Sequence, residues 1–88
     1  PLIFLLVFLT QCSRETPEQR YEALVARARQ FKQEKKWDEA RITLSSALDL
    51  RPSAEGYFEL AEVMMQLGNF GRAREYYQTA LNNDSAHR

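Results

Sequence analysis

Several features that mark common protein classes are scarce in this chain. Acidic and basic residues balance at 12 each, so the formal net charge is zero. Nucleic-acid-binding domains normally carry a basic excess, which is missing here. A single cysteine excludes an intramolecular disulfide framework, and the single histidine, His87, stands next to the end of the sequence. The length of 88 residues allows at most one small domain. Because the charges balance, we expect no nucleic-acid partner.

Residue patterns typical of catalytic and cofactor sites are also absent. The three glycines are scattered and form no phosphate-binding loop. The sequence offers no candidate general base that could activate Ser45 or Ser46 as a nucleophile. Glu59 and Glu62 are spaced for one helix face, but no histidine or third carboxylate accompanies them, so we interpret them as solvated acids. We expect no enzyme activity, no cofactor, no metal and no small-molecule substrate.

The sequence opens with an apolar run. Residues 2–9 read Leu-Ile-Phe-Leu-Leu-Val-Phe-Leu, which is typical of the apolar core of a secretory signal. The run is shorter than the ~20 residues that a bilayer span needs. Because the chain starts with Pro1 and no basic segment precedes the run, we expect it to be a fragment of a longer protein. Residues 1–12 are predicted to be a signal peptide or membrane anchor, and residues 13–19 a tether and helix cap.

The rest of the chain repeats itself at an offset of 33 residues. This offset pairs identical residues at helical spacing, and it also pairs the turns. The identical pairs are Glu22 with Glu55, Ala28 with Ala61, Gln33 with Gln66, Ala40 with Ala73, Arg41 with Arg74, Ala47 with Ala80 and Leu48 with Leu81. Apolar residues recur every three or four positions and no stretch alternates with period two, so the pattern predicts helices and no sheet.

Capping and turn residues divide this region into four helices. Thr16, Pro17 and Gln19 form a predicted capping box at the start of the first helix. The second helix follows from Trp37 to Leu50, and Pro52 ends it. The third helix is predicted to start at a Ser53 cap and to stop at Gly68-Asn69, a left-handed C-cap. The fourth begins at Phe70.

Large, small and aromatic residues stand at matching positions of two successive units. In the first unit they are Leu24, Ala28, Phe31, Trp37, Ala40, Leu44, Ala47 and Pro52. In the second unit they are Tyr57, Leu60, Ala61, Met64, Gly68, Phe70, Ala73, Tyr77 and Ala80. This pattern resembles the tetratricopeptide repeat. Three residues depart from the pattern: Arg27 replaces a leucine, Lys35 a turn glycine and Ser85 the closing proline. The resemblance implies an all-α fold with two tandem helix-turn-helix units, residues 20–53 and 54–88, forming part of a right-handed α-solenoid.

The resemblance also implies a binding groove for a protein or an extended peptide. In this family the concave surface is lined by the first helix of each unit. Carried over by position, the partner-binding residues are Val25, Arg29, Lys32, Phe58, Glu62 and Met65. Phe58 and Met65 favour a contact surface, since they are large apolar residues outside the core stripe. Val25 and Arg29 stand where a carboxylate-clamping groove needs lysine and asparagine, so we exclude a chaperone-tail clamp.

Cys12 follows the apolar run directly. Leu9-Thr10-Gln11-Cys12 resembles the lipobox of bacterial lipoproteins, although Gln11 stands where a smaller residue is usual. The resemblance implies lipidation at Cys12, and Ser13 after it is compatible with sorting to the outer membrane. The expected location is the bacterial cell envelope, with the domain facing the periplasm. A plain secretory signal and a retained membrane anchor remain the alternatives.

These observations favour a lipid-anchored adaptor that binds a protein or peptide through its groove, in an envelope-assembly or secretion role. One alternative is a structural scaffold whose repeats stack with further repeats or with another subunit. Another is a regulatory domain attached to a catalytic region beyond Arg88.

Overall fold

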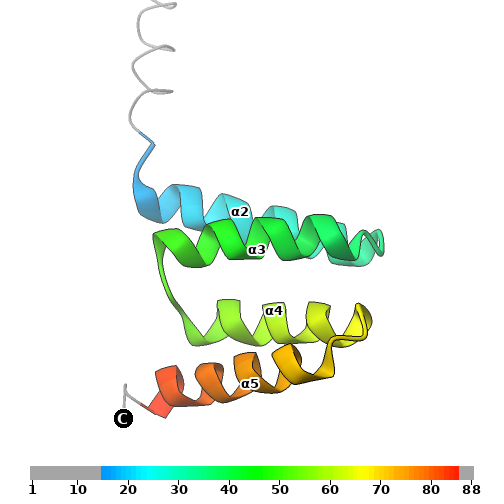
Figure 1. Cartoon of the computed structure of the whole chain (residues 1–88). Helices are drawn as coiled ribbons and strands as arrows, with labels where there is room; N and C mark the ends of the chain where they lie inside the picture. Colours follow the sequence, from blue (N-terminus) through cyan, green and yellow to red (C-terminus); the bar gives the residue numbers. More distant parts are fainter. Residues whose placement is uncertain (1–14, 86–88) are drawn as a thin grey trace, which may run out of the picture.

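The structure, a computed structural model, describes residues 15–85, and this part of the chain contains four α-helices and no strand. The helices are α2 (Pro17–Gln33), α3 (Trp37–Leu50), α4 (Ala54–Gln66) and α5 (Phe70–Ser85). They form two helical hairpins, α2–α3 and α4–α5, which lie one above the other (Figure 1). The predicted all-helical class is confirmed. The apolar segment 1–12, with Cys12, lies outside the described residues.

The helix starts follow the predicted caps. The backbone N–H of Gln19 donates to Thr16 Oγ1 at 3.1 Å, and the Thr16 N–H donates to Gln19 Oε1 at 3.1 Å. Pro17 occupies the first turn, where its missing N–H would have no helical partner. At the start of α4, the Gly56 N–H donates to Ser53 Oγ at 3.0 Å. Both capping predictions are therefore confirmed.

The two hairpins turn in the same way. The N–H of Lys36 donates to the carbonyl of Phe31 at 2.9 Å, and the N–H of Asn69 donates to the carbonyl of Met64 at 2.9 Å. The residue before each donor is left-handed, with φ of 61° at Lys35 and 82° at Gly68. Glycine adopts this conformation at no steric cost, but lysine does not. The first hairpin thus makes the same turn as the second with a less suitable residue.

One hydrophobic cluster spans both hairpins. It consists of Ala28, Ala40, Leu44, Leu48, Leu60 and Val63, with Phe31, Trp37, Tyr57 and Tyr76 packed against it. Leu44 from α3 and Val63 from α4 are fully buried. The small residues let the helices approach closely. A side chain at Gly56 would place Cβ 2.7 Å from Leu48 Cδ2, so this glycine is needed where α4 crosses α3.

The buried face of α2 agrees with the prediction in part. Helical spacing in the sequence predicts a buried stripe of Tyr21, Leu24, Ala28 and Phe31. In the structure Tyr21, Val25 and Ala28 are buried, while Leu24 is half-buried. Tyr21 and Val25 pack against Ala47 of α3. Tyr21 and Ala28 are therefore buried as predicted, and the difference is that Val25 is buried more deeply than Leu24.

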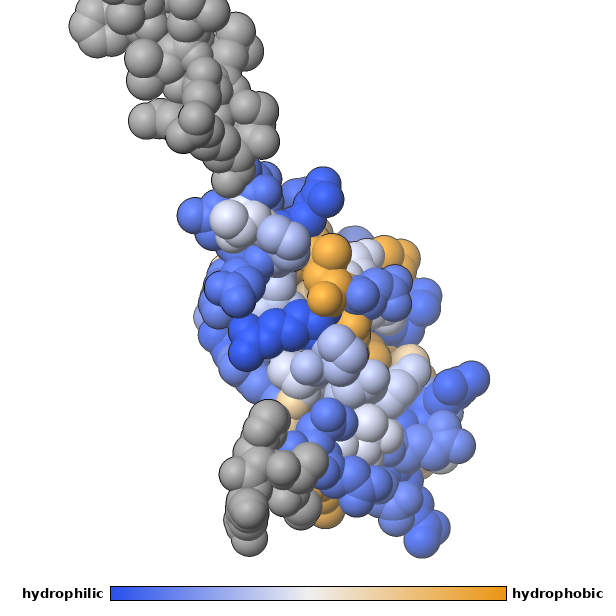
Figure 2. Space-filling view, turned by 90° about the vertical axis from the view of Figure 1, so that its left-hand side faces the viewer, coloured by the Kyte–Doolittle hydropathy of each residue, from blue (hydrophilic) through white to orange (hydrophobic). Residues whose placement is uncertain are grey.

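Polar and apolar side chains both reach the surface. The face in Figure 2 is largely hydrophilic, with limited hydrophobic areas. No helix within residues 15–85 is long and apolar enough to cross a membrane.

Candidate protein-interaction surface

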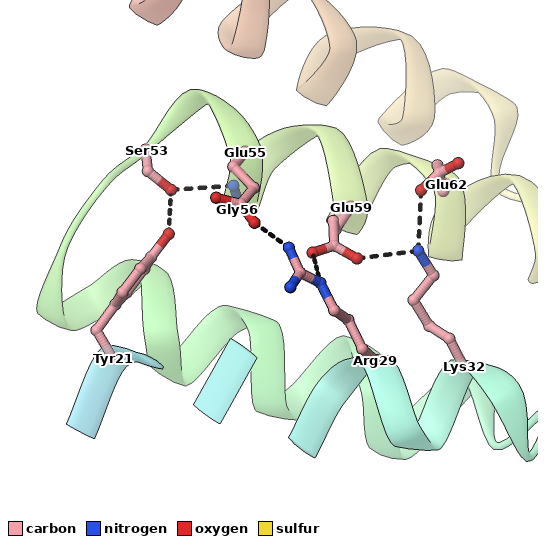
Figure 3. A network of polar contacts seen from close by, with 8 residues as sticks. All are labelled: Tyr21, Arg29, Lys32, Ser53, Glu55, Gly56, Glu59 and Glu62. Atoms are coloured by element: carbon pink, nitrogen blue, oxygen red, sulfur yellow. Dashed lines mark hydrogen bonds and ion pairs between the residues drawn. The ribbon is translucent and has the colours of Figure 1, made fainter. Parts of the chain in front are cut away.

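A network of charged side chains connects α2 to α4, and we call it the α2–α4 seam. Arg29 and Lys32 extend from α2 toward Glu55, Glu59 and Glu62 of α4 (Figure 3). Arg29 Nε donates to Glu59 Oε2 at 2.8 Å, and Arg29 also pairs with Glu55. Lys32 Nζ donates to Glu59 Oε1 at 3.1 Å and to Glu62 Oε1 at 2.9 Å. The seam holds three carboxylates and two cations, so it carries an excess negative charge.

Glu59 is the centre of the seam. Its exposed fraction is 7%, and each of its two carboxylate oxygens accepts from a different cation. A carboxylate at this depth is stable only when it is paired, because burial penalises an isolated charge heavily. Our interpretation of Glu59 as a solvated acid is therefore wrong, since the neighbouring hairpin covers it. Glu62, which is half-buried, keeps more contact with solvent.

The seam also affects proton binding on its two cations. The hydrogen bond and charge of Glu59 raise the pKa of Arg29 above its ordinary value, and Glu55 adds to this. Burial lowers the pKa of Lys32, but hydrogen bonds to Glu62 and Glu59, with their charges, outweigh burial and raise that pKa overall. Both side chains therefore remain charged at neutral pH.

A second polar contact links the two hairpins at one end of the seam. The Tyr21 hydroxyl from α2 and the Ser53 hydroxyl lie 2.5 Å apart, and Ser53 also caps α4 (Figure 3). The Arg51 guanidinium lies over the Tyr21 ring, 5.2 Å from its centroid. One tyrosine thus connects α2 to the segment that starts α4.

The six predicted groove residues fall into three groups. Arg29, Lys32 and Glu62 are brought together in the seam. Phe58 and Met65 are exposed, at 49% and 43%, on α4. Val25 must be corrected: it is 4% exposed and packs against Tyr21 and Ala47, so it offers no contact to a partner. Val25 is buried because α2 packs against α3 at Ala47.

Phe58 lies beside an open apolar hollow of about 500 Å³ between α4 and α5. We call it the α4–α5 hollow. Its lining residues are Ala54, Glu55, Phe58, Tyr77, Ala80 and Leu81. Phe58 and Tyr77 form an edge-to-face pair with ring centroids 5.5 Å apart. Leu81 is 65% exposed, whereas its equivalent in the first hairpin, Leu48, is 8% exposed.

Sequence reasoning missed Glu59 and Ser53 as contacts between the hairpins. A signal for Glu59 was available, since it adjoins Leu60 in the stripe that also contains Gly56 and Val63. A charged residue in such a stripe suggests a partner of opposite charge, and Arg29 and Lys32 are three positions apart on α2. No group of three metal-binding side chains occurs within the part of the chain that the structure describes.

Comparison with known proteins gives one match. Residues 54–87 match the family model described as tetratricopeptide repeat. Searches of curated proteins and of solved structures found no match. A tetratricopeptide repeat is thus present in this chain, and the four-helix structure supports a tetratricopeptide-repeat protein. Repeats of this family generally mediate protein–protein interactions and are generally non-catalytic.

Proposed function

We propose that this protein is a lipid-anchored adaptor of the bacterial cell envelope, which binds an extended peptide or a protein segment along the α2–α4 seam. The observation that carries the proposal is that the exposed apolar residue Met65 stands three positions, about one helical turn, after Glu62, a partly exposed carboxylate of the seam. A surface of this composition is suited to a partner that carries both apolar and charged side chains.

The charges of the seam favour a particular type of peptide. Arg29 and Lys32 are already occupied by glutamates, and the carboxylates outnumber the cations. A basic side chain of the peptide therefore meets favourable potential near Glu55 and Glu62, whereas an acidic one meets repulsion. An apolar side chain in the same peptide would pack on Met65.

Anchoring belongs to the same proposal, and it rests on the sequence from Leu9 to Cys12. A thioether-linked lipid on Cys12 would hold the domain at a membrane surface, with residues 13–16 as a short tether. We propose the outer membrane, with the helical hairpins facing the periplasm.

The groove is tested by site-specific photo-cross-linking in bacteria that express the full-length gene. A photoreactive amino acid replaces Met65 in one strain and Gln78, an exposed residue of α5, in the control strain. We expect a discrete cross-linked product from position 65 and none from position 78. Equal products from both positions, or none from either, would contradict a groove at the seam.

Lipidation is tested in the same bacterium with labelled palmitate. The wild-type protein should carry the label, and Cys12→Ala should lose it and accumulate as unprocessed precursor. A label that persists in the alanine variant would refute lipidation at this cysteine, whatever the result of the cross-linking.

A further inference from the structure

The first hairpin has a partly apolar surface on the side that faces away from the shared core. Ile42 of α3 stands two residues before Leu44, which is fully buried in that core. Two residues turn a helix by roughly 200°, so Ile42 lies on the opposite side of α3 from Leu44. A shallow hollow of about 260 Å³ opens there between α2 and α3, and its lining includes Leu24, Arg27, Phe31, Glu39 and Ile42. We call this surface the outer face of the first hairpin.

The outer face continues toward the start of α2. A second hollow between the two helices is lined by Pro17 and Arg20 of α2 and by Leu50 at the end of α3. Arg20 is one helical turn before Leu24, so the two hollows adjoin along α2. Ile42 is 56% exposed and Leu50 is 40% exposed, and neither belongs to a buried cluster of the described residues. Two large apolar side chains therefore reach the surface on this face.

Two arginines accompany these apolar residues. Arg20 and Arg27 are both exposed, and neither takes part in an ion pair within residues 15–85, in contrast to Arg29 of the seam. The Arg27 guanidinium lies over the Phe31 ring, 5.6 Å from its centroid. Two acids, Glu15 and Glu39, also line the hollows, so the acids and bases of this face balance. Such a face matches a surface that offers both phosphate and ammonium groups.

The short tether places the bilayer near this face. In the proposed lipoprotein, processing makes Cys12 the first residue, and residues 13–16 alone precede α2. These are too few for a helix that could stack on the outer face, since the shortest of the four described helices has 13 residues. The extended chain from Cys12 to Pro17 spans at most about 18 Å. The lipid surface is therefore the structure that the tether keeps close to the first hairpin.

We propose that the outer face of the first hairpin rests against the phospholipid headgroups of the bilayer that holds the anchor. Arg20 and Arg27 contact lipid phosphates, while Ile42 and Leu50 lie at the boundary between headgroups and acyl chains. The second hairpin then lies on the far side of the first one from the bilayer (Figure 1). This inference rests on the anchor at Cys12 in the proposed function and adds how the domain is oriented on it.

The orientation is tested on vesicles of phosphatidylethanolamine and phosphatidylcholine. The full chain is attached to them through its single cysteine, Cys12, with a maleimide-bearing phospholipid. A photoreactive amino acid replaces Ile42 in one protein and Leu81, a 65% exposed apolar residue of the second hairpin, in the control. Mass spectrometry measures phospholipid adducts. We expect adducts at position 42 to be at least about fivefold more abundant than at position 81, because only the outer face meets the headgroups.

Two double variants test the contribution of the arginines. With the photoreactive group at position 42, Arg20→Glu combined with Arg27→Glu should lower the yield of lipid adducts by about threefold or more, because the new carboxylates repel the phosphates. Arg72→Glu combined with Arg74→Glu, which changes the charge of two exposed residues of α5 by the same amount, should have little effect. Circular dichroism checks that both proteins keep their helices.

Three results would overturn the proposal: equal adducts at positions 42 and 81, no adducts at position 42, or a yield that the Arg20 and Arg27 substitutions leave unchanged. Failure of the orientation and failure of the anchor are distinguishable, because the vesicle attachment is chemical. Absence of the palmitate label in the bacterium refutes lipidation of Cys12, whereas absence of adducts at position 42 on vesicles refutes the orientation.

Discussion

Lys35 shows how a single residue can fit its position poorly while the turn around it is kept. It adopts φ 61° at the end of α2, where the equivalent residue of the second hairpin is Gly68. The backbone hydrogen bonds of the two turns are the same, so the strain at Lys35 is tolerated rather than relieved.

We predict that Lys35→Gly raises the free energy of unfolding by about 0.5–1 kcal/mol, since it removes the left-handed strain at a small entropic cost. Lys35→Ala keeps the strain and should give no increase. Chemical denaturation followed by circular dichroism distinguishes the two variants. A lysine-to-glycine change that destabilises the protein would show that the turn is not strained.

Lys32 gives the stability a dependence on alkaline pH. Its pKa in the folded protein is raised above the ordinary value of 10.5 by Glu62 and Glu59, in spite of burial. A group with a raised pKa contributes stability that is fully present below its unfolded pKa and is lost as pH rises through the folded pKa. The Lys32 contribution should therefore be constant near neutral pH and disappear only above about pH 10.5.

We predict that Lys32→Met lowers the free energy of unfolding by about 1–2 kcal/mol at pH 7, because Glu59 loses one of its two charged partners. The difference between the variant and the wild type should shrink as pH rises beyond 10.5. Urea denaturation at a series of pH values measures it. A difference that is already lost at pH 9 would contradict a raised lysine pKa.

At the scale of the helix, two glycines have opposite roles. Gly56 lies in α4 at the crossing with α3, where an added Cβ would be 2.7 Å from Leu48 and 2.9 Å from Ser53 Oγ. Gly71 lies in the first turn of α5, and nothing is within 4 Å of the position that its Cβ would take. At Gly56 the effect of a larger residue is therefore set by packing, and at Gly71 it is set by helix propensity.

We predict that Gly56→Ala destabilises the protein by about 1 kcal/mol, because the steric cost exceeds the gain in helix propensity. Gly71→Ala should instead stabilise it by up to about 0.5–1 kcal/mol. Thermal melts of the two variants provide the test, each serving as the control for the other. Melting temperatures that shift in the same direction in both variants would contradict a close crossing of α3 and α4.

For the molecule as a whole, the two hairpins share one core and one ion-pair seam. Leu44 and Leu48 of the first hairpin are in the same cluster as Leu60 and Val63 of the second. Each hairpin therefore completes its largest buried cluster with residues of the other, which is the usual reason why helical repeats unfold cooperatively.

We predict that Val63→Ala destabilises both hairpins together, by about 1–3 kcal/mol, since it removes fully buried methyl groups from the shared core. Trp37, the single tryptophan, is in the first hairpin, so its fluorescence reports that hairpin, while circular dichroism reports all four helices. The two transitions should coincide in the wild type and shift equally in the variant. Separate midpoints would indicate that the hairpins unfold independently.

Local sequence signals were sufficient to predict the helices and where they begin and end. Thr16 with Gln19, Ser53, and Gly68 each act through backbone groups a few residues away, so their effect is independent of how the hairpins stack. The 33-residue offset likewise placed the two turns correctly, because equivalent residues make the same local hydrogen bonds.

The tertiary structure alone decided which side chains meet between the hairpins. Val25 is buried because α2 packs against Ala47 of α3, and Glu59 is buried and paired because α4 lies near Arg29 and Lys32 of α2. Phe58 and Leu81 are exposed because no described element lies against α4 and α5 there. Helical periodicity tells which residues share a face, but the number of neighbours on that face depends on the stacking of whole elements. The helices and turns of this protein are therefore determined locally, whereas its seam and its hollow follow from the packing of one hairpin on the next.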